Sequence, residues 1–271
     1  MPEDALPAGV VVGSLEHILF ITLTAAIDYQ RDADSLWVEA RMTYEDPETT
    51  YLFRPLSLVN ISFESVVRDM QKHALSRKPY KDANIWKTIA DTFAKKWQGN
   101  PIEFVHDCAW DAVKILERLR TDTHIVGRSS FPDYPYLRGK KIGPLWLRML
   151  RDNVGVGNIE HLDRVPIPVD VHVARASLAL GIVRGTYRGK LDPIYEEIRE
   201  AWFVSTRGLR YGQRGMIALD VDKPLWNLSK FGCAHRQVRG EGCSNRAVCR
   251  ARDLCVPGII SLNNTEVELD T

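Results

Sequence analysis

The sequence predicts an all-α fold, and two observations carry this prediction. Apolar residues recur at helical spacing through most of the chain, as in residues 14–40, where Ser14 is a suitable N-cap and the pattern continues to Trp37. Strand-like alternation is scarce, and residues 50–59 are the only segment that invites a strand assignment. The chain also shows no internal repeat and no low-complexity segment.

The remaining helices follow from the same apolar periodicity. Each segment is long enough for a globular helix and carries apolar residues three and four positions apart. They cover residues 58–75, 83–97, 102–119, 142–150, 171–183, 192–204 and 223–232.

The composition bounds the class of protein. The chain has 271 residues, 45% hydrophobic and 26% charged, which suits one large or two modest soluble domains. No apolar run approaches the roughly 20 residues that a membrane helix needs. The first nine residues are acidic and proline-rich, unlike a signal or transit peptide. We therefore expect a cytoplasmic protein without a membrane partner, and a monomer.

The charge is unevenly distributed although the net charge is only +1. Basic residues gather in residues 118–151 and again in residues 207–252, whereas acids gather in residues 42–50 and in the C-terminal tail. Such segregation favours binding of a polyanion on one face. Solvated helix faces are the alternative explanation.

Four of the five cysteines fall in the last forty residues. Their spacing, nine, five and five residues, lacks the short knuckles of most zinc sites. A [4Fe–4S] cluster tolerates wider spacing, because each iron takes one cysteine. We expect a [4Fe–4S] cluster, with zinc and free cysteines as alternatives, while Cys108 on an apolar helix is a core residue. The expected ligands are Cys233, Cys243, Cys249 and Cys255.

Two helix openings combine polar groups with an apolar helix. Lys140 and Lys141 follow Gly139 and open the apolar segment 142–150. Asp170 follows Pro168 and opens the segment 171–183, where it can cap the helix. A glycine turn at a helix N-terminus can bind a DNA phosphate through backbone N–H groups.

Three segments together resemble the helix-hairpin-helix DNA glycosylases, the superfamily of endonuclease III. "RGKKIG" (138–143) is similar to the family hairpin, with Lys141 as its lysine, although Leu137 stands where the family has its first glycine. "PVDVH" (168–172) is similar to the catalytic aspartate motif. "LWNLSKFGC" (225–233) and "RDLC" (252–255) are similar to the two ends of the cluster motif. The lysine–aspartate separation and a D-x-x-L-W pattern at 222–226 also resemble the archaeal 8-oxoguanine glycosylase branch.

The resemblance implies an enzyme that flips a damaged base out of double-stranded DNA and excises it. Lys141 would attack the sugar carbon and form a Schiff base, which permits strand cleavage at the abasic site, and Asp170 would stabilise the transition state. The phosphate contacts would come from Gly139, Lys140, Gly143, Arg148 and His172. The base pocket would use Asp28, Tyr29, Gln30, Asp222 and Trp226, and an oxidised base such as 8-oxoguanine is the expected target.

The same resemblance implies two lobes. The first would span residues 15–165 with the hairpin, and the second would combine residues 1–14 with 166–271, including a cluster loop at 233–255. A shifted register places Leu145 at the lysine position, which would make the enzyme monofunctional, with Asp170 activating water. Its target could then be a mismatched base or an enzymatically modified one, such as a phage base. A non-catalytic DNA-binding module is the remaining alternative.

Overall fold

The computed structural model describes residues 1–236, 243–263 and 265–271, and the chain divides into two compact units. Unit 1 is Met1–Arg164 and unit 2 is Val165–Thr271. The boundary lies one residue before the one that the sequence predicts. Residues 1–14 belong to unit 1, where Glu3 pairs with Arg148 and the Ala8 N–H donates to Glu45, whereas the sequence predicts them in the second lobe.

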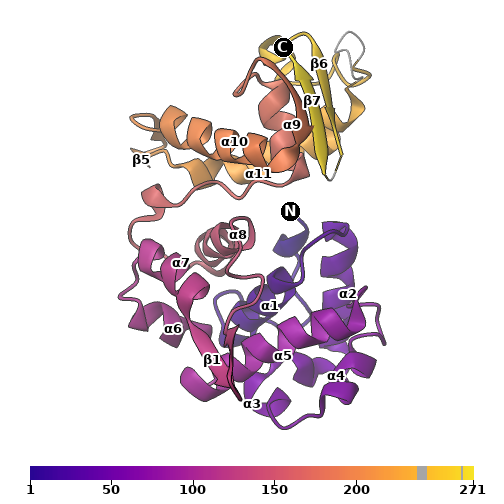
Figure 1. Cartoon of the computed structure of the whole chain (residues 1–271), viewed down its shortest axis with the longest axis vertical. Helices are drawn as coiled ribbons and strands as arrows, with labels where there is room; N and C mark the ends of the chain where they lie inside the picture. The colour runs from indigo at the N-terminus through magenta and orange to yellow at the C-terminus, as the bar shows by residue number, and fades with distance from the viewer. Residues whose placement is uncertain (237–242, 264) are drawn as a thin grey trace. The chain divides into compact units, whose positions relative to one another are not determined.

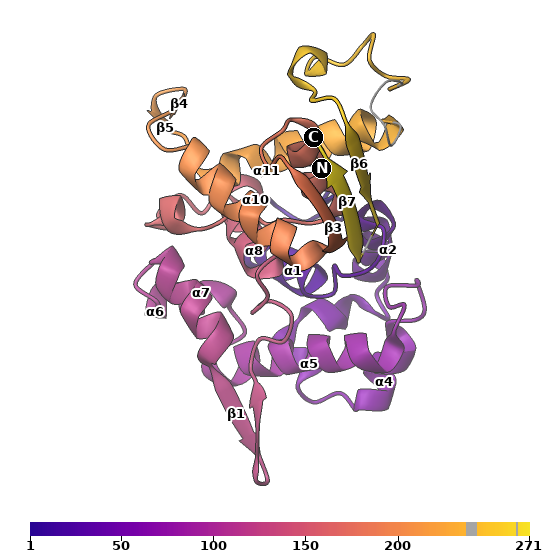
Figure 2. The ribbon, with the colours of Figure 1, turned by 45° about the horizontal axis from the view of Figure 1, so that its top comes forward.

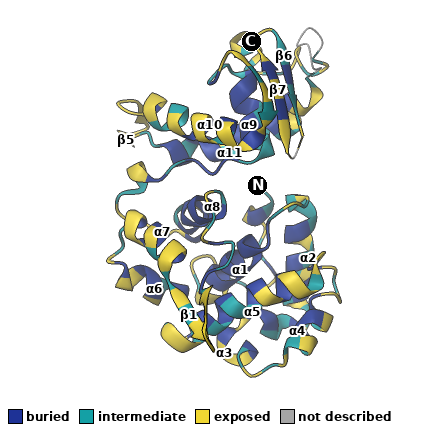
Figure 3. Cartoon of the chain, viewed as in Figure 1, coloured by how far each residue is buried: buried dark blue, intermediate teal, exposed yellow. Residues whose placement is uncertain are grey.

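Unit 1 is built around the buried helix α1 (Leu15–Ala26). Ser14 caps it, because the Ser14 hydroxyl accepts a hydrogen bond from the His17 N–H. Ten of its twelve residues are buried, and it contacts α2, α5, α6 and α8 (Figures 1 and 3). The other helical elements are η1 (Pro2–Asp4), α2 (Ala33–Glu45), η2 (Thr50–Phe53), α3 (Pro55–Leu58), α4 (Phe63–Asp69), α5 (Pro79–Lys96), α6 (Pro101–Asp107), α7 (Ala112–Thr121), α8 (Ile142–Met149), η3 (Leu150–Val154) and η4 (Leu162–Arg164).

Two predicted helices of unit 1 are interrupted. The pattern at 14–40 divides at residues 27–32, where Asp32 caps α2. The pattern at 102–119 divides at Ala109 and Trp110, which both have positive φ, and Asp111 then caps α7. Helical periodicity survives such a break in the sequence, because the apolar faces on both sides pack into the same core.

Unit 2 packs α9 (Val171–Ala179) against α10 (Leu191–Ser205), α11 (Asp222–Phe231) and a small sheet. The sheet is antiparallel in the order β3 (Thr186–Lys190), β7 (Glu266–Asp270) and β6 (Ile259–Leu262), as Figure 2 shows. In β7, Val267 and Leu269 face the core, while the three acidic residues that alternate with them are exposed. The other elements are β4 (Arg210–Tyr211), β5 (Arg214–Gly215), η5 (Ala218–Val221), η6 (Cys233–His235) and η7 (Arg252–Leu254).

The all-α prediction is wrong. The chain is about 52% helical and 11% strand, with three small antiparallel sheets in its described part, so its class is mixed α and β. Besides the three-stranded sheet, β1 (Thr123–Val126) pairs with β2 (Ser129–Pro132), and β4 pairs with β5. Strands of two to five residues are too short for a periodic signal. The segment 50–59, the one tempting strand, is instead helical in η2 and α3.

Candidate functional site

The glycine turn before α8 is closed by its own backbone. The Gly139 N–H donates to the Tyr136 carbonyl at 2.9 Å, and the Gly143 N–H donates to the Gly139 carbonyl at 3.0 Å. A Cβ on Gly143 would lie 2.9 Å from a Leu116 methyl and from the Leu137 carbonyl, so only glycine fits there. Both glycines thus shape the turn, and their amide hydrogens are already bonded within it.

This turn places the Lys141 amine beside a distant carboxylate. Lys141 is the N-cap residue of α8, and its side chain is 30% exposed. Its Nζ lies 3.7 Å from Asp28 Oδ2 and donates to the Asp28 carbonyl at 3.4 Å. Asp28 follows the end of α1 and is buried. The structure therefore joins two predicted site residues, 113 positions apart, in one half-buried ion pair.

Two stacked tyrosines of unit 1 are close to this pair in the sequence, because Tyr29 directly follows Asp28 and Tyr136 shortly precedes Lys141. Tyr29 and Tyr136 have ring centroids 4.2 Å apart and an interplanar angle of 27°. The Tyr29 hydroxyl donates to the buried Asp82, and burial followed by this bond raises the pKa of Tyr29. The ammonium groups of Lys78 and Lys81 lie 5.3 and 4.9 Å from the centroid of the Tyr29 ring. We call Tyr29, Tyr136, Lys78 and Lys81 the tyrosine–lysine cluster.

Gln30 joins the cluster at its exposed side. It has a positive φ of 51°, and its Oε1 accepts a hydrogen bond from Lys78 Nζ at 2.8 Å. The sequence predicts Asp28, Tyr29 and Gln30 as site residues but misses Lys78, Lys81, Asp82 and Tyr136. The only sequence signal for Lys78, Lys81 and Asp82 was the basic, aromatic stretch "RKPYKD" (77–82), whose relation to the hairpin depends on the fold.

Three further predicted residues of α8 and its opening differ in exposure. Lys140 is exposed. Arg148 is wholly buried, and its guanidinium bonds to Glu3 at 2.7 Å and to Asn153 at 3.0 Å, so it is withdrawn from any phosphate. Leu145, the residue that the shifted register would align with the lysine, is buried in the apolar face of α8.

Asp170 is the N-cap of α9 in unit 2. Its Oδ1 accepts hydrogen bonds from the N–H groups of His172 and Val173, both at 2.8 Å. The carboxylate is only partly buried. Burial and then the charge of Asp170 raise the pKa of Tyr195 to about 12, so this hydroxyl keeps its proton near the carboxylate. The structure therefore shows Asp170 as a partly buried helix cap whose neighbouring tyrosine is neutral.

His172 and Trp226 pack against each other within unit 2, and Asp222 lies at the start of α11. The rings of His172 and Trp226 have centroids 5.2 Å apart, and His172 Nδ1 lies 3.3 Å from Ser229 Oγ. Trp226 and Asp222 are both buried, with Lys230 Nζ 4.6 Å from the centroid of the Trp226 ring. The contacts of His172 with Trp226 and Ser229 join α9 to α11.

The predicted catalytic pair is divided between the units. Lys141 belongs to unit 1 and Asp170 to unit 2. The approach of the two side chains to one sugar thus remains a prediction.

Four of the cysteines line one hollow. Its other lining residues include Arg236, Arg246 and Arg252, and Arg236 also bonds to the carbonyls of Val256 and Gly258. Within residues 1–236, 243–263 and 265–271, no three His, Cys, Asp or Glu side chains are grouped closely enough to hold a metal ion. Part of the predicted cluster loop, residues 237–242, lies outside the described residues. The cysteines are Cys233, Cys243, Cys249 and Cys255.

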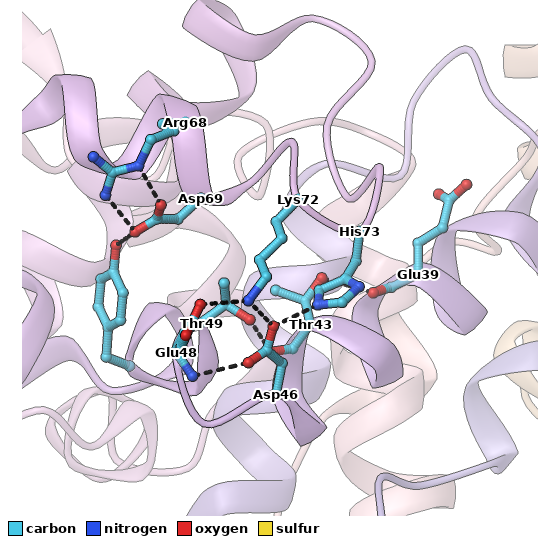
Figure 4. Close-up of polar contacts among 10 residues, drawn as sticks. Glu39, Thr43, Asp46, Glu48, Thr49, Arg68, Asp69, Lys72 and His73 are labelled. Carbon is cyan, nitrogen blue, oxygen red and sulfur yellow. Dashed lines mark hydrogen bonds and ion pairs between the residues drawn. The ribbon is translucent and has the colours of Figure 1, made fainter.

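A second polar group in unit 1 is structural (Figure 4). Asp46 accepts from Lys72 Nζ at 2.6 Å and from the Glu48 N–H at 2.9 Å, and lies 2.7 Å from His73 Nε2. Lys72 and then His73 hold the pKa of Asp46 well below its ordinary value. The bonds join the end of α2 to the segment after α4, so this network ties a loop.

None of the helices that the structure describes has the length and apolar character needed to span a bilayer. Comparison of the sequence with protein-family models and with curated proteins finds no match.

Proposed function

We propose that the protein is a DNA glycosylase with abasic-site lyase activity, and that Lys141 is its nucleophile. One observation carries the proposal: the Lys141 amine lies half-buried at a helix opening, 3.7 Å from Asp28 and close in sequence to a stacked tyrosine. Most structural lysines of a surface helix extend into solvent, whereas a nucleophilic lysine must be held near a reacting atom.

In the proposed reaction the Lys141 ammonium first gives up a proton to solvent, and the resulting neutral amine attacks C1′ of the flipped nucleotide. The bond between C1′ and the base breaks, and the base leaves with the bonding electron pair and takes up a proton. The amine then loses a proton as the sugar ring opens, which gives a protonated Schiff base. Loss of a C2′ proton expels the 3′ phosphate, so the strand is cut by β-elimination. Asp28 is a positioning residue, because it holds the amine through the ion pair.

Asp170 supplies the second charge of the proposed mechanism. The sugar carries positive charge as the base leaves, and a fixed carboxylate lowers the free energy of that state. The two hydrogen bonds from backbone N–H groups to Oδ1 fix the Asp170 side chain, so little reorganisation is needed when the charge develops.

Double-stranded DNA with a flipped base is the proposed ligand. Exposed cations near Lys141 in sequence or space, namely Lys78, Lys81 and Lys140, suit phosphate contacts. An oxidised base such as 8-oxoguanine is the proposed target, by the resemblance of Asp222 and Trp226 to the archaeal branch. The same site could serve repair of the cell's own DNA or removal of modified phage bases.

A [4Fe–4S] cluster is proposed for the cysteine hollow. Its support is that four cysteines line one hollow with three arginines, which would offset the negative charge of a thiolate-bound cluster. In the described part of the chain these cysteines are not grouped closely enough to hold a metal ion as they stand, so the loop would have to close around the cluster. Cys233, Cys243, Cys249 and Cys255 would hold it, and its role would be to fold the basic segment around them. Iron and acid-labile sulfide, measured on protein purified without oxygen, test it, and bound zinc instead of iron would contradict it.

Borohydride trapping tests the enzyme itself. Protein incubated with abasic duplex DNA and borohydride should form a covalent adduct, which Lys141→Gln abolishes and the neighbouring control Lys140→Gln retains. A panel of duplexes with 8-oxoguanine, oxidised pyrimidines, mismatches and modified cytosines then identifies the base released. Asp170→Asn should lower that release. Base release without any adduct would support the monofunctional alternative, and absence of both would leave a DNA-binding module.

A further inference from the structure

The hairpin of β4 and β5 has a composition that the proposed active site does not explain. Arg210 pairs with Gly215 and Tyr211 with Arg214, and the Met216 N–H donates to the Leu209 carbonyl at 2.9 Å. The turn uses Gly212, whose φ is 61°. Figure 2 shows the hairpin beyond the end of α10. We call residues 203–216 the arginine hairpin.

The arginine hairpin is strongly basic. It contains Arg207, Arg210 and Arg214, all exposed, and no acidic residue. The Arg207 guanidinium lies 4.3 Å from the centroid of the Phe203 ring, and that of Arg214 lies 5.3 Å from the Tyr211 ring. Stacking holds a guanidinium plane while its N–H edge can still donate to a phosphate.

Large apolar side chains are exposed between these arginines. Tyr211 is 58% exposed and Leu209 is 52% exposed. Neither contributes to the buried core of unit 2. A basic segment interleaved with exposed aromatic groups is typical of surfaces that bind the backbone of a nucleic acid and stack on its bases.

The hairpin is also held in place before any ligand binds. Arg214 forms two bonds of 2.7 Å to the carboxylate of Asp220, and Asp220 also accepts from the Ile217 N–H at 3.0 Å. These bonds join the hairpin to η5, which leads into α11. A prearranged element loses less conformational entropy on binding.

We propose that the arginine hairpin is a DNA-binding element of unit 2, in which Arg207 and Arg210 contact phosphates and Tyr211 stacks on an unpaired base. Arg210 has donors to spare, because its one described bond, to the Gln213 carbonyl at 2.9 Å, uses one of five N–H groups. The inference rests on DNA being the ligand of the proposed function, but not on Lys141 chemistry.

Salt-dependent binding tests the phosphate contacts. The dissociation constant for a duplex with a tetrahydrofuran abasic analogue is measured by fluorescence anisotropy over a series of KCl concentrations. Arg207→Ala/Arg210→Ala should weaken binding and lower the slope of log affinity against log salt by about two. Arg188→Ala, which removes an exposed arginine from β3, is the matched control and should leave the slope unchanged.

Tyr211 variants test the stacking. Tyr211→Ala should raise the dissociation constant for a duplex with an unpaired base by roughly fivefold to a hundredfold. Tyr211→Phe should bind like the wild type, and a fully paired duplex should be little affected.

The outcomes separate this inference from the proposed enzyme. If the double variant is folded by circular dichroism and keeps the wild-type slope and affinity, the inference is overturned and the hairpin serves another partner, such as an acidic protein. If the slope falls but the wild type forms no borohydride adduct and releases no base, the hairpin inference stands and the proposed enzyme fails. If the wild type forms an adduct while the double variant keeps the wild-type slope, the proposed enzyme stands and the hairpin inference fails.

Discussion

The openings of α8 and α9 offer the two charged groups of the proposed chemistry, but they hold them in different ways. Asp170 is held by the first amides of its own helix, at His172 and Val173. Lys141 is held by Asp28, which arrives from another helix end 113 residues earlier. The first arrangement is local and the second is tertiary. A change at Asp170 should therefore act on one helix, whereas a change at Lys141 or Asp28 should act on a contact between distant segments.

The largest effect should follow from removal of the tertiary nucleophile. Lys141→Gln should lower abasic-site cleavage by about a thousandfold or more, since the attacking group is lost. Lys140→Gln should stay within a few-fold of the wild type, because it removes one exposed cation proposed to contact phosphate and leaves the attacking amine in place. Single-turnover cleavage of abasic duplex measures both rates. Equal losses of cleavage rate in the two variants would contradict the assignment of Lys141 as the nucleophile.

The next effect concerns the other tertiary ion pair of α8. Glu3→Ala should lower the free energy of unfolding of unit 1 by about 3–5 kcal/mol, because it removes the carboxylate that lies 2.7 Å from the wholly buried guanidinium of Arg148. Urea denaturation followed by circular dichroism measures the change. Glu117→Ala, which removes an exposed carboxylate from α7, is the control and should cost far less. A small loss of stability in Glu3→Ala would mean that water takes the place of the Glu3 carboxylate beside Arg148.

Asp28→Asn tests the pairing at Lys141 directly. Cleavage of abasic DNA should fall about ten- to a hundredfold, because the amine is no longer held in place. The acid limb of the pH–rate profile should also move to lower pH, because the ammonium loses a neighbouring negative charge. A purely structural role for Asp28 would lower the amount of folded protein and leave that profile where it was.

The local side of the comparison is tested by a pair of variants at Asp170. Asp170→Ala should lower the free energy of unfolding by about 1 kcal/mol, the usual value of an N-cap, while Asp170→Asn should nearly preserve it. Base release should fall in both variants, because both lack the charge. Thermal unfolding and the release assay together separate capping from catalysis. Full base release by Asp170→Asn would limit Asp170 to capping.

The smallest effect belongs to the network around Asp46. The pKa of Asp46 is depressed by Lys72 and His73, so its contribution to stability is present above the ordinary carboxyl pKa. That contribution is lost as the pH falls from about 4 toward the depressed value. Asp46→Asn should flatten this acid limb of a plot of melting temperature against pH. Cleavage of abasic DNA by Asp46→Asn at neutral pH should match the wild type. A loss of cleavage would show that the network around Asp46 also affects the proposed active site.

Much of the local structure could be predicted because it depends on neighbouring residues. Ser14 and Asp170 cap the expected helices, and the apolar periodicity finds the helices themselves. The short strands could not be predicted in this way. In "EVELD" (266–270), alternation reads as an acidic tail until the strand pairs with β3, more than seventy residues earlier.

The candidate site divides along the same line. The sequence alone places Lys141 and Asp170 at the N-termini of two helices, because capping and apolar periodicity depend on residues only a few positions apart. Folding decides that Lys141 meets Asp28, that Arg148 is buried against Glu3, and that Lys78 and Lys81 lie over Tyr29. Burial and charge pairing join segments that are distant along the chain, and no local pattern encodes which of them will meet.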